Sequence, residues 1–201
     1  MLYKKLFAKV YDPFMTRIEK HIGPVRAELL GDLRGRILDV GAGTGANFAY
    51  FHPDAEVIAI EPSRPMMEVA LKKIHRYPNI QMHHIGVNDP GMDRLIAPAS
   101  LDYIINTLVL CTIPDPKAAL RRYRRWLKPT GRLIVLEHIK SEPKLYGWMQ
   151  EVFNPVWRVI GDGCHINRHT DEYIREAGFV PVEQKYRGQM LRWVKGTYII
   201  N

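Results

Sequence analysis

The segment Ile37–Ala46 has the sequence ILDVGAGTGA, in which an apolar run leads directly into three alternating glycines. Glycines at this place allow a tight turn after a strand and let a ligand approach the backbone closely. One acid, Asp39, stands two residues before the first glycine, and a second, Glu61, ends the next apolar run. This arrangement predicts a nucleotide-type cofactor at the end of a parallel strand.

Two classes of cofactor fit these residues. Gly41-x-Gly43-x-x-Ala46 satisfies the dinucleotide fingerprint, with Glu61 twenty residues beyond Gly41, so an NAD-dependent oxidoreductase is one interpretation. A pyrophosphate, however, gains nothing from a nearby carboxylate such as Asp39, whereas a cationic amino-acid group does. S-adenosylmethionine carries an ammonium, a sulfonium and a ribose diol, which suits acids at Asp39 and Glu61.

From Arg36 onward, short apolar runs alternate with helical segments, which is typical of βαβ units in a mostly parallel, doubly wound α/β sheet. Strands are predicted at Arg36–Val40, Val57–Glu61, Ile80–Ile85, Leu101–Thr107 and Arg132–His138. Helices are predicted at Gly45–Phe51, Pro65–His75 with Ser63 as cap, Pro116–Leu127, Lys144–Ile160 with a kink at Pro155, and Thr170–Ala177 with Thr170 as cap. The runs Phe179–Tyr186 and Leu191–Ile200 predict a terminal hairpin at the edge of the sheet.

The length of 201 residues and the 46% hydrophobic content favour one globular domain, 1–201. Within it, we expect residues 1–34 to form a helical lid and residues 144–177 a helical insertion on the substrate side. Two cysteines and the lack of a long apolar run predict a reducing, cytoplasmic location without a disulfide framework, signal peptide or membrane span.

The formal net charge is +8, and most of it lies in one segment. Between Lys117 and Arg132 there are seven basic residues and no acidic one. Lys117, Arg121, Arg124 and Lys128 recur at helical spacing, which predicts a basic outer face for the helix within 117–128. This face is either simply solvated or a site for anionic lipid or an acidic partner. No nucleic-acid-binding signature accompanies it, so no nucleic acid is expected.

The first residues form a second amphipathic pattern, with lysines between apolar side chains at helical spacing (Leu2, Tyr3, Leu6, Phe7, Val10, Tyr11 and Phe14). Pro13 is expected to interrupt this helix, and Asp12 to cap a second one. The segment either packs on the core or forms a mobile lid that also touches a bilayer interface.

Three motifs together resemble those of class I S-adenosylmethionine-dependent methyltransferases of the type 11 group: Leu38–Gly45, Ile60–Ser63 and Leu127–Arg132. The resemblance covers Gly35–Ile200 and implies a Rossmann-like, seven-stranded sheet whose last strand is antiparallel. It also implies S-adenosylmethionine as cofactor and S-adenosylhomocysteine as product.

The resemblance further implies a set of cofactor-binding residues. Asp39, Gly41 and Gly43 would face the methionine part, Glu61 would bind the ribose hydroxyls, and Asn106 and Thr107 would lie beside the transferable methyl group. Where relatives carry an acid near the adenine, this chain has Gly86 and Val87, so either Asn88 or a backbone amide is expected to take that role. The complete expected set is Tyr11, Asp39, Gly41, Gly43, Gly45, Asn47, Glu61, Pro62, Val87, Asn88, Asn106 and Thr107.

Asn106–Cys111, Leu136–His138 and Asn154–Cys164 resemble the branch that contains the animal alkyl thiol methyltransferases and phospholipid N-methyltransferase-like proteins. We therefore expect a small apolar or amphiphilic acceptor, either a lipid amine, a thiol or a quinone, and an enzyme in the cytoplasm or at the periphery of a membrane. A peripheral membrane-binding module is the non-enzymatic alternative.

Methyl transfer requires alignment above all, and a general base only if the acceptor arrives protonated. His138 and Asp162 are the candidate bases, with His165 beside them, and structural hydrogen bonding is the alternative role for each. The pattern Cys164-His165-x-x-x-His169 does not supply the four ligands of a closed site, so no metal is expected.

Overall fold

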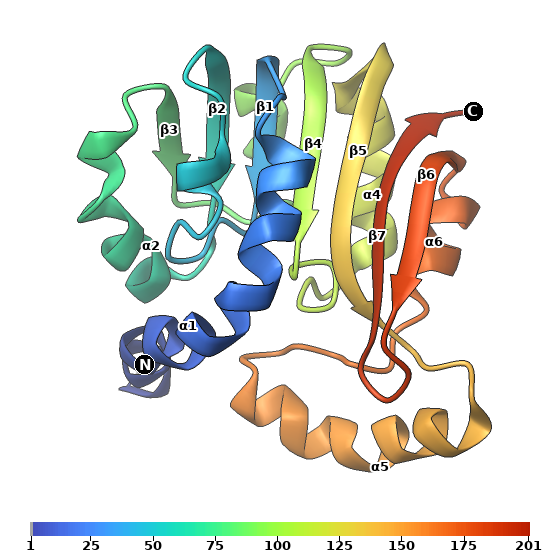
Figure 1. Ribbon diagram of the computed structural model, residues 1–201. Helices are drawn as coiled ribbons and strands as arrows, with labels where there is room; N and C mark the ends of the chain where they lie inside the picture. The colour runs from blue at the N-terminus through green and yellow to red at the C-terminus, as the bar shows by residue number, and fades with distance from the viewer. Residues whose placement is uncertain (1) are drawn as a thin grey trace. The chain divides into compact units, whose positions relative to one another are not determined.

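The computed structural model describes residues 2–201. Seven strands form one mixed sheet in the order β3-β2-β1-β4-β5-β7-β6 (Figure 1). The strands are β1 (Gly35–Val40), β2 (Ala55–Ile60), β3 (Ile80–His83), β4 (Leu101–Thr107), β5 (Leu127–Ile139), β6 (Phe179–Arg187) and β7 (Arg192–Ile200). Strand β7 pairs antiparallel with both β5 and β6, which confirms the predicted Rossmann-like sheet with an antiparallel last strand.

The chain divides into two compact units. Unit 1 contains the chain up to Leu95 together with Leu101–Tyr103, and unit 2 contains Ile96–Ser100 and Ile104–Asn201. The residues of the predicted site are divided between the two units.

In unit 1, β1, β2 and β3 are parallel neighbours. Four consecutive residues at the end of β1 and four at the end of β2 are buried, as is typical of strands that are covered on both faces, and all of them except Asp39 are apolar. The register pairs Val40 with Ile60, so both strands end at the same level. The glycine turn, which follows β1, therefore lies beside Glu61, which follows β2.

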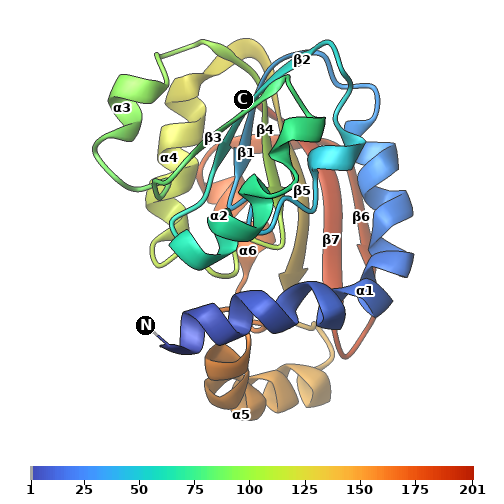
Figure 2. The same cartoon turned by 90° about the vertical axis from the view of Figure 1, so that its left-hand side faces the viewer.

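The N-terminal helix α1 extends over Leu2–Leu30 and contains both Pro13 and Pro24. The prediction that Pro13 would end a helix is wrong, because an internal proline removes one backbone hydrogen bond but need not end a helix whose neighbours are packed. Instead α1 changes direction along its length (Figure 2). Ala8, Ile22 and Leu30 bury the inner side of α1, whereas Tyr3, Leu6 and Val10 are exposed.

The predicted helix at Gly45–Phe51 is absent from the described chain, which there forms consecutive turns and a short 3-10 helix, η1 (Phe48–Tyr50). Gly45 has a φ of +81°, a value outside the helical region. The backbone bonds are of the i→i−3 kind, from Gly45 N to Ala42 O at 2.8 Å and from Phe48 N to Gly45 O at 3.3 Å. The remaining elements of unit 1 are α2 (Arg64–Leu71), η2 (Ile74–Arg76) and α3 (Met92–Leu95).

Unit 2 contains α4 (Pro116–Trp126), α5 (Lys144–Ile160) and α6 (Thr170–Glu176) around its strands. Helix α4 is amphipathic as predicted, with Leu120, Tyr123 and Trp126 fully buried. Its N-cap is Asp115, whose side chain accepts from Ala118 N. The predicted cap Thr170 is instead the first buried residue of α6, and His169 occupies the N-cap position.

Part of the predicted basic face of α4 contacts other residues of unit 2. Lys117 Nζ lies 2.7 Å from Glu176 Oε2 and 4.8 Å from the centre of the Tyr173 ring. Arg124 donates to the backbone oxygen of Ala177 at 2.9 Å. These two cations therefore contact α6 and the turn that follows it, although both contacts are exposed to solvent.

Substitution of Gly45 by alanine is expected to destabilise the protein by about 2–3 kcal/mol. A Cβ atom there would lie 2.7 Å from the Phe48 ring, in a left-handed backbone conformation that disfavours side chains. Gly86→Ala is the matched control, because its Cβ would meet Pro62 at an ordinary 3.6 Å. Urea unfolding of the two variants measures the difference, and equal midpoints would contradict the assigned strain.

Candidate active site

The carboxylate of Glu61 is fixed beside the glycine turn of unit 1. Its Oε2 accepts from Gly43 N at 2.9 Å and its Oε1 accepts from Ser63 N at 2.7 Å. Gly41 and Gly43 have φ values of +64° and +58°, so the turn uses the left-handed conformation that glycine adopts most easily. The two backbone N–H groups hold the Glu61 carboxylate in one orientation, and a carboxylate is an acceptor that suits the two hydroxyl groups of a ribose.

Asp39, in β1, is fully buried. Its Oδ1 accepts from Asn47 Nδ2 at 2.7 Å, and its Oδ2 has no hydrogen-bond partner within the described chain. Burial raises the pKa of Asp39 to about 7, against the opposing effects of the Asn47 hydrogen bond and the Arg26 charge. The ionised form of Asp39 therefore lowers the free energy of unfolding as long as no cation is bound beside it.

Helix α1 supplies a chain of polar contacts that ends at Asp39. Glu19 Oε1 accepts from Arg26 Nε at 3.0 Å, and Arg26 Nη1 donates in turn to Asn47 Oδ1. Arg26 is almost completely buried. The sequence gives little sign of this role, because one arginine in a basic amphipathic segment looks like a surface residue.

A second contact joins α1 to the glycine turn. Asp12 Oδ1 accepts from Thr44 Oγ1 at 2.6 Å. Asp12 was expected to cap a second helix, but it lies within α1 instead. Tyr11, the expected cofactor-side tyrosine, is half-buried and its ring lies 5.5 Å from that of Phe7.

The loops that follow β2 and β3 lie against each other. A Cβ on Gly86 would be 3.6 Å from Pro62, and Pro62 O lies 3.0 Å from His84 Nε2. Val87 is buried and Asn88 is half-buried in the same loop. The structure therefore brings Pro62 close to the Gly86–Asn88 loop, as expected for two sides of one nucleoside site.

In unit 2, Asn106 and Thr107 are buried at the end of β4. Asn106 Oδ1 accepts from the Tyr123 hydroxyl at 3.0 Å. Glu137, which sequence analysis did not single out, is fully buried in β5, and its Oε1 accepts from Val109 N at 2.6 Å and Leu110 N at 2.7 Å. Burial raises the pKa of Glu137 to about 7 despite these bonds.

The candidate bases occupy different surroundings. His138 is buried in β5, and its ring meets the edge of Trp193 with the two centres 3.9 Å apart. Asp162 is half-buried in the loop after α5, with a φ of +46°. Burial lowers the pKa of the neighbouring His165.

Two cysteines that appeared unpartnered from spacing meet in unit 2. Cys164 Sγ lies 3.3 Å from Cys111 Sγ, both side chains are buried, and His138 adjoins them. Their mutual hydrogen bond lowers the pKa of the Cys164 thiol to about 5 and raises that of Cys111. The spacing of 53 residues between them hid this cluster from sequence analysis.

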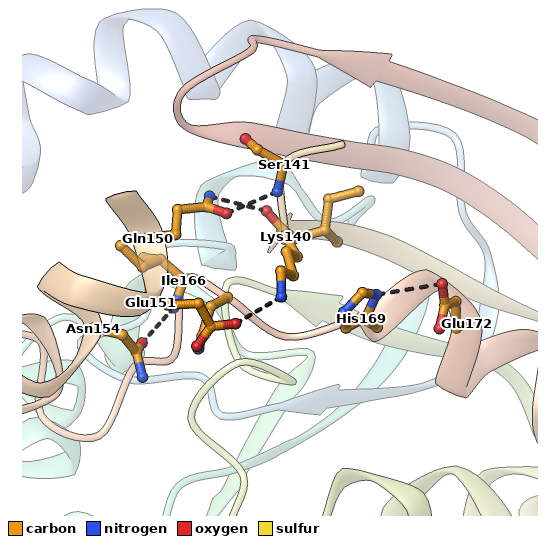
Figure 3. Close-up of polar contacts among 10 residues, drawn as sticks. Lys140, Ser141, Gln150, Glu151, Asn154, Ile166, His169 and Glu172 are labelled. Carbon is orange, nitrogen blue, oxygen red and sulfur yellow. Dashed lines mark hydrogen bonds and ion pairs between the residues drawn. The ribbon is translucent and has the colours of Figure 1, made fainter. Parts of the chain in front are cut away.

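Helix α5 presents its polar side to the protein. Its buried residues are Gly147, Gln150 and Asn154. Figure 3 shows Gln150 bonded to Ser141, and Asn154 Oδ1 accepting from Ile166 N at 3.1 Å. Lys140 also pairs with Glu151 at 2.7 Å (Figure 3).

The opposite side of α5 is apolar and exposed. Its exposed residues lie at helical spacing: Leu145, Trp148, Val152, Val156 and Val159, with Phe153 and Ile160 beside them. Trp148 and Phe153 are 64% and 59% exposed, so neither lines a closed acceptor pocket. No helix within residues 2–201 is long and apolar enough to cross a bilayer.

The site of unit 1 fits S-adenosylmethionine. The unpartnered Asp39 Oδ2 suits an ammonium group, and the oriented Glu61 carboxylate suits a ribose diol. Together with the fold, these features define a class I S-adenosylmethionine-dependent methyltransferase.

Comparison with known proteins supports the same class of enzyme. A methyltransferase domain model matches residues 38–135. Thiol S-methyltransferase TMT1B of Rattus norvegicus is 31% identical over 92% of this chain and 82% of its own, and human TMT1A is 29% identical over 96% and 77%. The chain therefore belongs to the methyltransferase family that contains these proteins, and its cofactor is S-adenosylmethionine. This confirms the methyltransferase prediction over the NAD-dependent one.

Solved structures show the same fold. A putative methyltransferase of Methanococcus maripaludis superposes with a TM-score of 0.66 over 99% of this chain and 94% of its own, at 21% identity. Geranyl diphosphate methyltransferase, solved with S-adenosylmethionine, gives 0.72 over 92% and 87%, at 12% identity.

Asp39→Asn is expected to stabilise the cofactor-free protein by about 2–4 kcal/mol at pH 8 and by much less at pH 4. The folded-state pKa of Asp39 is raised to about 7 from 3.8, so the wild-type protein loses stability as pH rises between these values and no further above them. Asparagine removes this loss. Urea unfolding at both pH values measures the effect, and a pH-independent difference would contradict the assigned ionisation.

Proposed function

We propose that this protein is a thiol S-methyltransferase acting on small apolar thiols. The observation that supports this acceptor is the similarity to thiol S-methyltransferases along 92% of the chain. A lipid amine and a quinone are the other acceptors considered, and the experiment below separates them from a thiol.

S-adenosylmethionine supplies a methyl group on a positively charged sulfur. In our proposal Asp39 accepts from the amino group of the methionine part, and Asn47 positions Asp39 through their hydrogen bond. Glu61 binds the ribose hydroxyls, with its carboxylate held by Gly43 N and Ser63 N. Gly41 and Gly45 shape the turn. Tyr11, Pro62, Val87 and Asn88 are the remaining proposed cofactor-binding residues of unit 1. Such orientation is the main contribution that a methyltransferase makes to the rate.

For unit 2 we propose the roles that the family resemblance implies. Asn106 and Thr107 would lie beside the transferred methyl group. A thiol acceptor is a strong nucleophile once deprotonated, so water can take its proton, or Asp162 or His138 can act as the base. His138 is the weaker candidate, because it is buried against Trp193 and two cysteines.

Labelled S-adenosylmethionine offered with hexanethiol, hexylamine and hexanol tests the acceptor, because these molecules differ in one atom. We expect methyl transfer to hexanethiol at a rate at least tenfold above the other two, increasing with pH as the thiolate forms. Phosphatidylethanolamine and a quinol complete the panel. Preferential methylation of any non-thiol would overturn the proposal.

Glu61→Ala serves as the inactive control in the same assay. We expect at least tenfold weaker binding of S-adenosylhomocysteine by calorimetry, since two hydroxyl partners are lost. Circular dichroism establishes whether the variant is folded. Unchanged affinity in a folded variant would refute the ribose role without affecting the acceptor assignment.

We also propose that the protein works in the cytoplasm at the periphery of an anionic membrane, with the exposed apolar side of α5 in the interface. A helix with its polar side toward the protein and its apolar side outward suits a lipid surface, and Lys144 and Arg158 near its ends suit anionic headgroups. Helix α4, the expected basic site, is the weaker candidate because α6 engages Lys117 and Arg124.

Val156→Ser is expected to weaken binding to phosphatidylglycerol vesicles about fivefold, since roughly 1 kcal/mol of apolar burial is lost. Val182→Ser is the matched control, because Val182 on β6 is 57% exposed and Val156 is 60% exposed. Co-sedimentation with anionic and neutral vesicles measures both. If the two variants bind alike, α5 is not the membrane-facing element.

A further inference from the structure

Three buried side chains of unit 2 converge from segments far apart in the sequence. Cys111 follows β4, His138 lies in β5, and Cys164 lies in the loop after α5. One ligand atom from each, two thiol sulfurs and an imidazole nitrogen, lies within 4.8 Å of the other two. His138 and Cys164 are each 8% exposed and Cys111 is 1% exposed.

His138 packs edge-on against Trp193 and lies against the Cys164 thiol. Both of its ring nitrogens are buried without a hydrogen-bond partner of good geometry in residues 2–201. A buried imidazole normally satisfies at least one nitrogen, because an unmet polar group costs free energy. A ligand bound at one nitrogen accounts for its burial.

The donor set selects a class of ligand. Two soft thiolates and one imidazole nitrogen are a donor set that zinc takes in proteins. A divalent ion with two thiolates and a neutral imidazole carries no net charge, which suits a site lined by Ile166 and Trp157. The 3.3 Å sulfur separation approaches the spacing of about 3.8 Å that tetrahedral zinc requires.

We propose that Cys111, His138 and Cys164 bind one Zn²⁺ ion through two thiolates and one imidazole nitrogen. Binding releases the two thiol protons to water and forms three bonds from the protein to the metal, with a water molecule as the fourth ligand, so no oxidant or reductant is involved. The ion ties the loop after α5 to β5 and to the loop after β4. This site differs from the one considered in the sequence, because His165 and His169 take no part in it.

Cobalt substitution tests the site without relying on catalytic activity. The full-length protein is stripped with a chelator under reducing conditions and titrated with Co²⁺. We expect sulfur-to-cobalt charge-transfer absorption and the visible bands of tetrahedral cobalt, both saturating at one equivalent. One equivalent of Zn²⁺ should abolish these bands and raise the Tm by about 5 °C.

Variants identify the ligands. Cys111→Ser and Cys164→Ser should lose most of the charge-transfer absorption and His138→Ala should weaken Co²⁺ binding at least tenfold, whereas His169→Asn should titrate like the wild-type protein. If a cysteine variant fails to fold, protection of both wild-type thiols from iodoacetamide by Zn²⁺ supplies the same information. The proposal is overturned if cobalt gives no charge-transfer band, if Zn²⁺ leaves both thiols equally reactive, or if the two thiols form a disulfide in place of the metal site.

Discussion

The carboxyl group of Asp39 has no contact with water, and much of unit 1 is arranged around its burial. One amide, that of Asn47, supports it, and Arg26 supports the amide from helix α1. The ionised group remains costly at neutral pH, as its raised pKa shows. A buried acid gains most when a cation binds beside it, so in the role proposed for Asp39 the cost of burial in the free protein would become affinity for the amino group of the cofactor.

The same chain of contacts explains why the N-terminal helix matters. Glu19, Arg26 and Asp12 all come from α1 and contact residues of the glycine segment or each other. The environment of Asp39 and the placement of α1 are thus linked through one set of hydrogen bonds. Helix α1 in this way contributes electrostatic support to the glycine segment.

Helix α5 turns its polar side toward the protein and its apolar side toward solvent, which is the reverse of the usual arrangement of an amphipathic helix. Gln150 and Asn154 face inward because they meet backbone groups that have no partner in secondary structure, at Ser141 and Ile166. These bonds position the loop that carries Cys164, so the thiol cluster and the outward apolar side depend on the same helix. The hydrophobic pattern alone predicts the helix but does not show which side faces the protein.

Local patterns were enough to predict the alternation of strands and helices, the helix Lys144–Ile160, the glycine turn and the two acids, because each depends on residues close together in the chain. The antiparallel last strand was expected from the family resemblance. They failed at Gly45–Phe51 and at Pro13, where backbone conformation and packing override helical spacing. Arg26, Glu137 and the Cys111–His138–Cys164 cluster emerged from the folded chain alone. Their roles rest on contacts between residues that are distant in sequence, and burial changes the chemistry of such groups only after those segments have packed together.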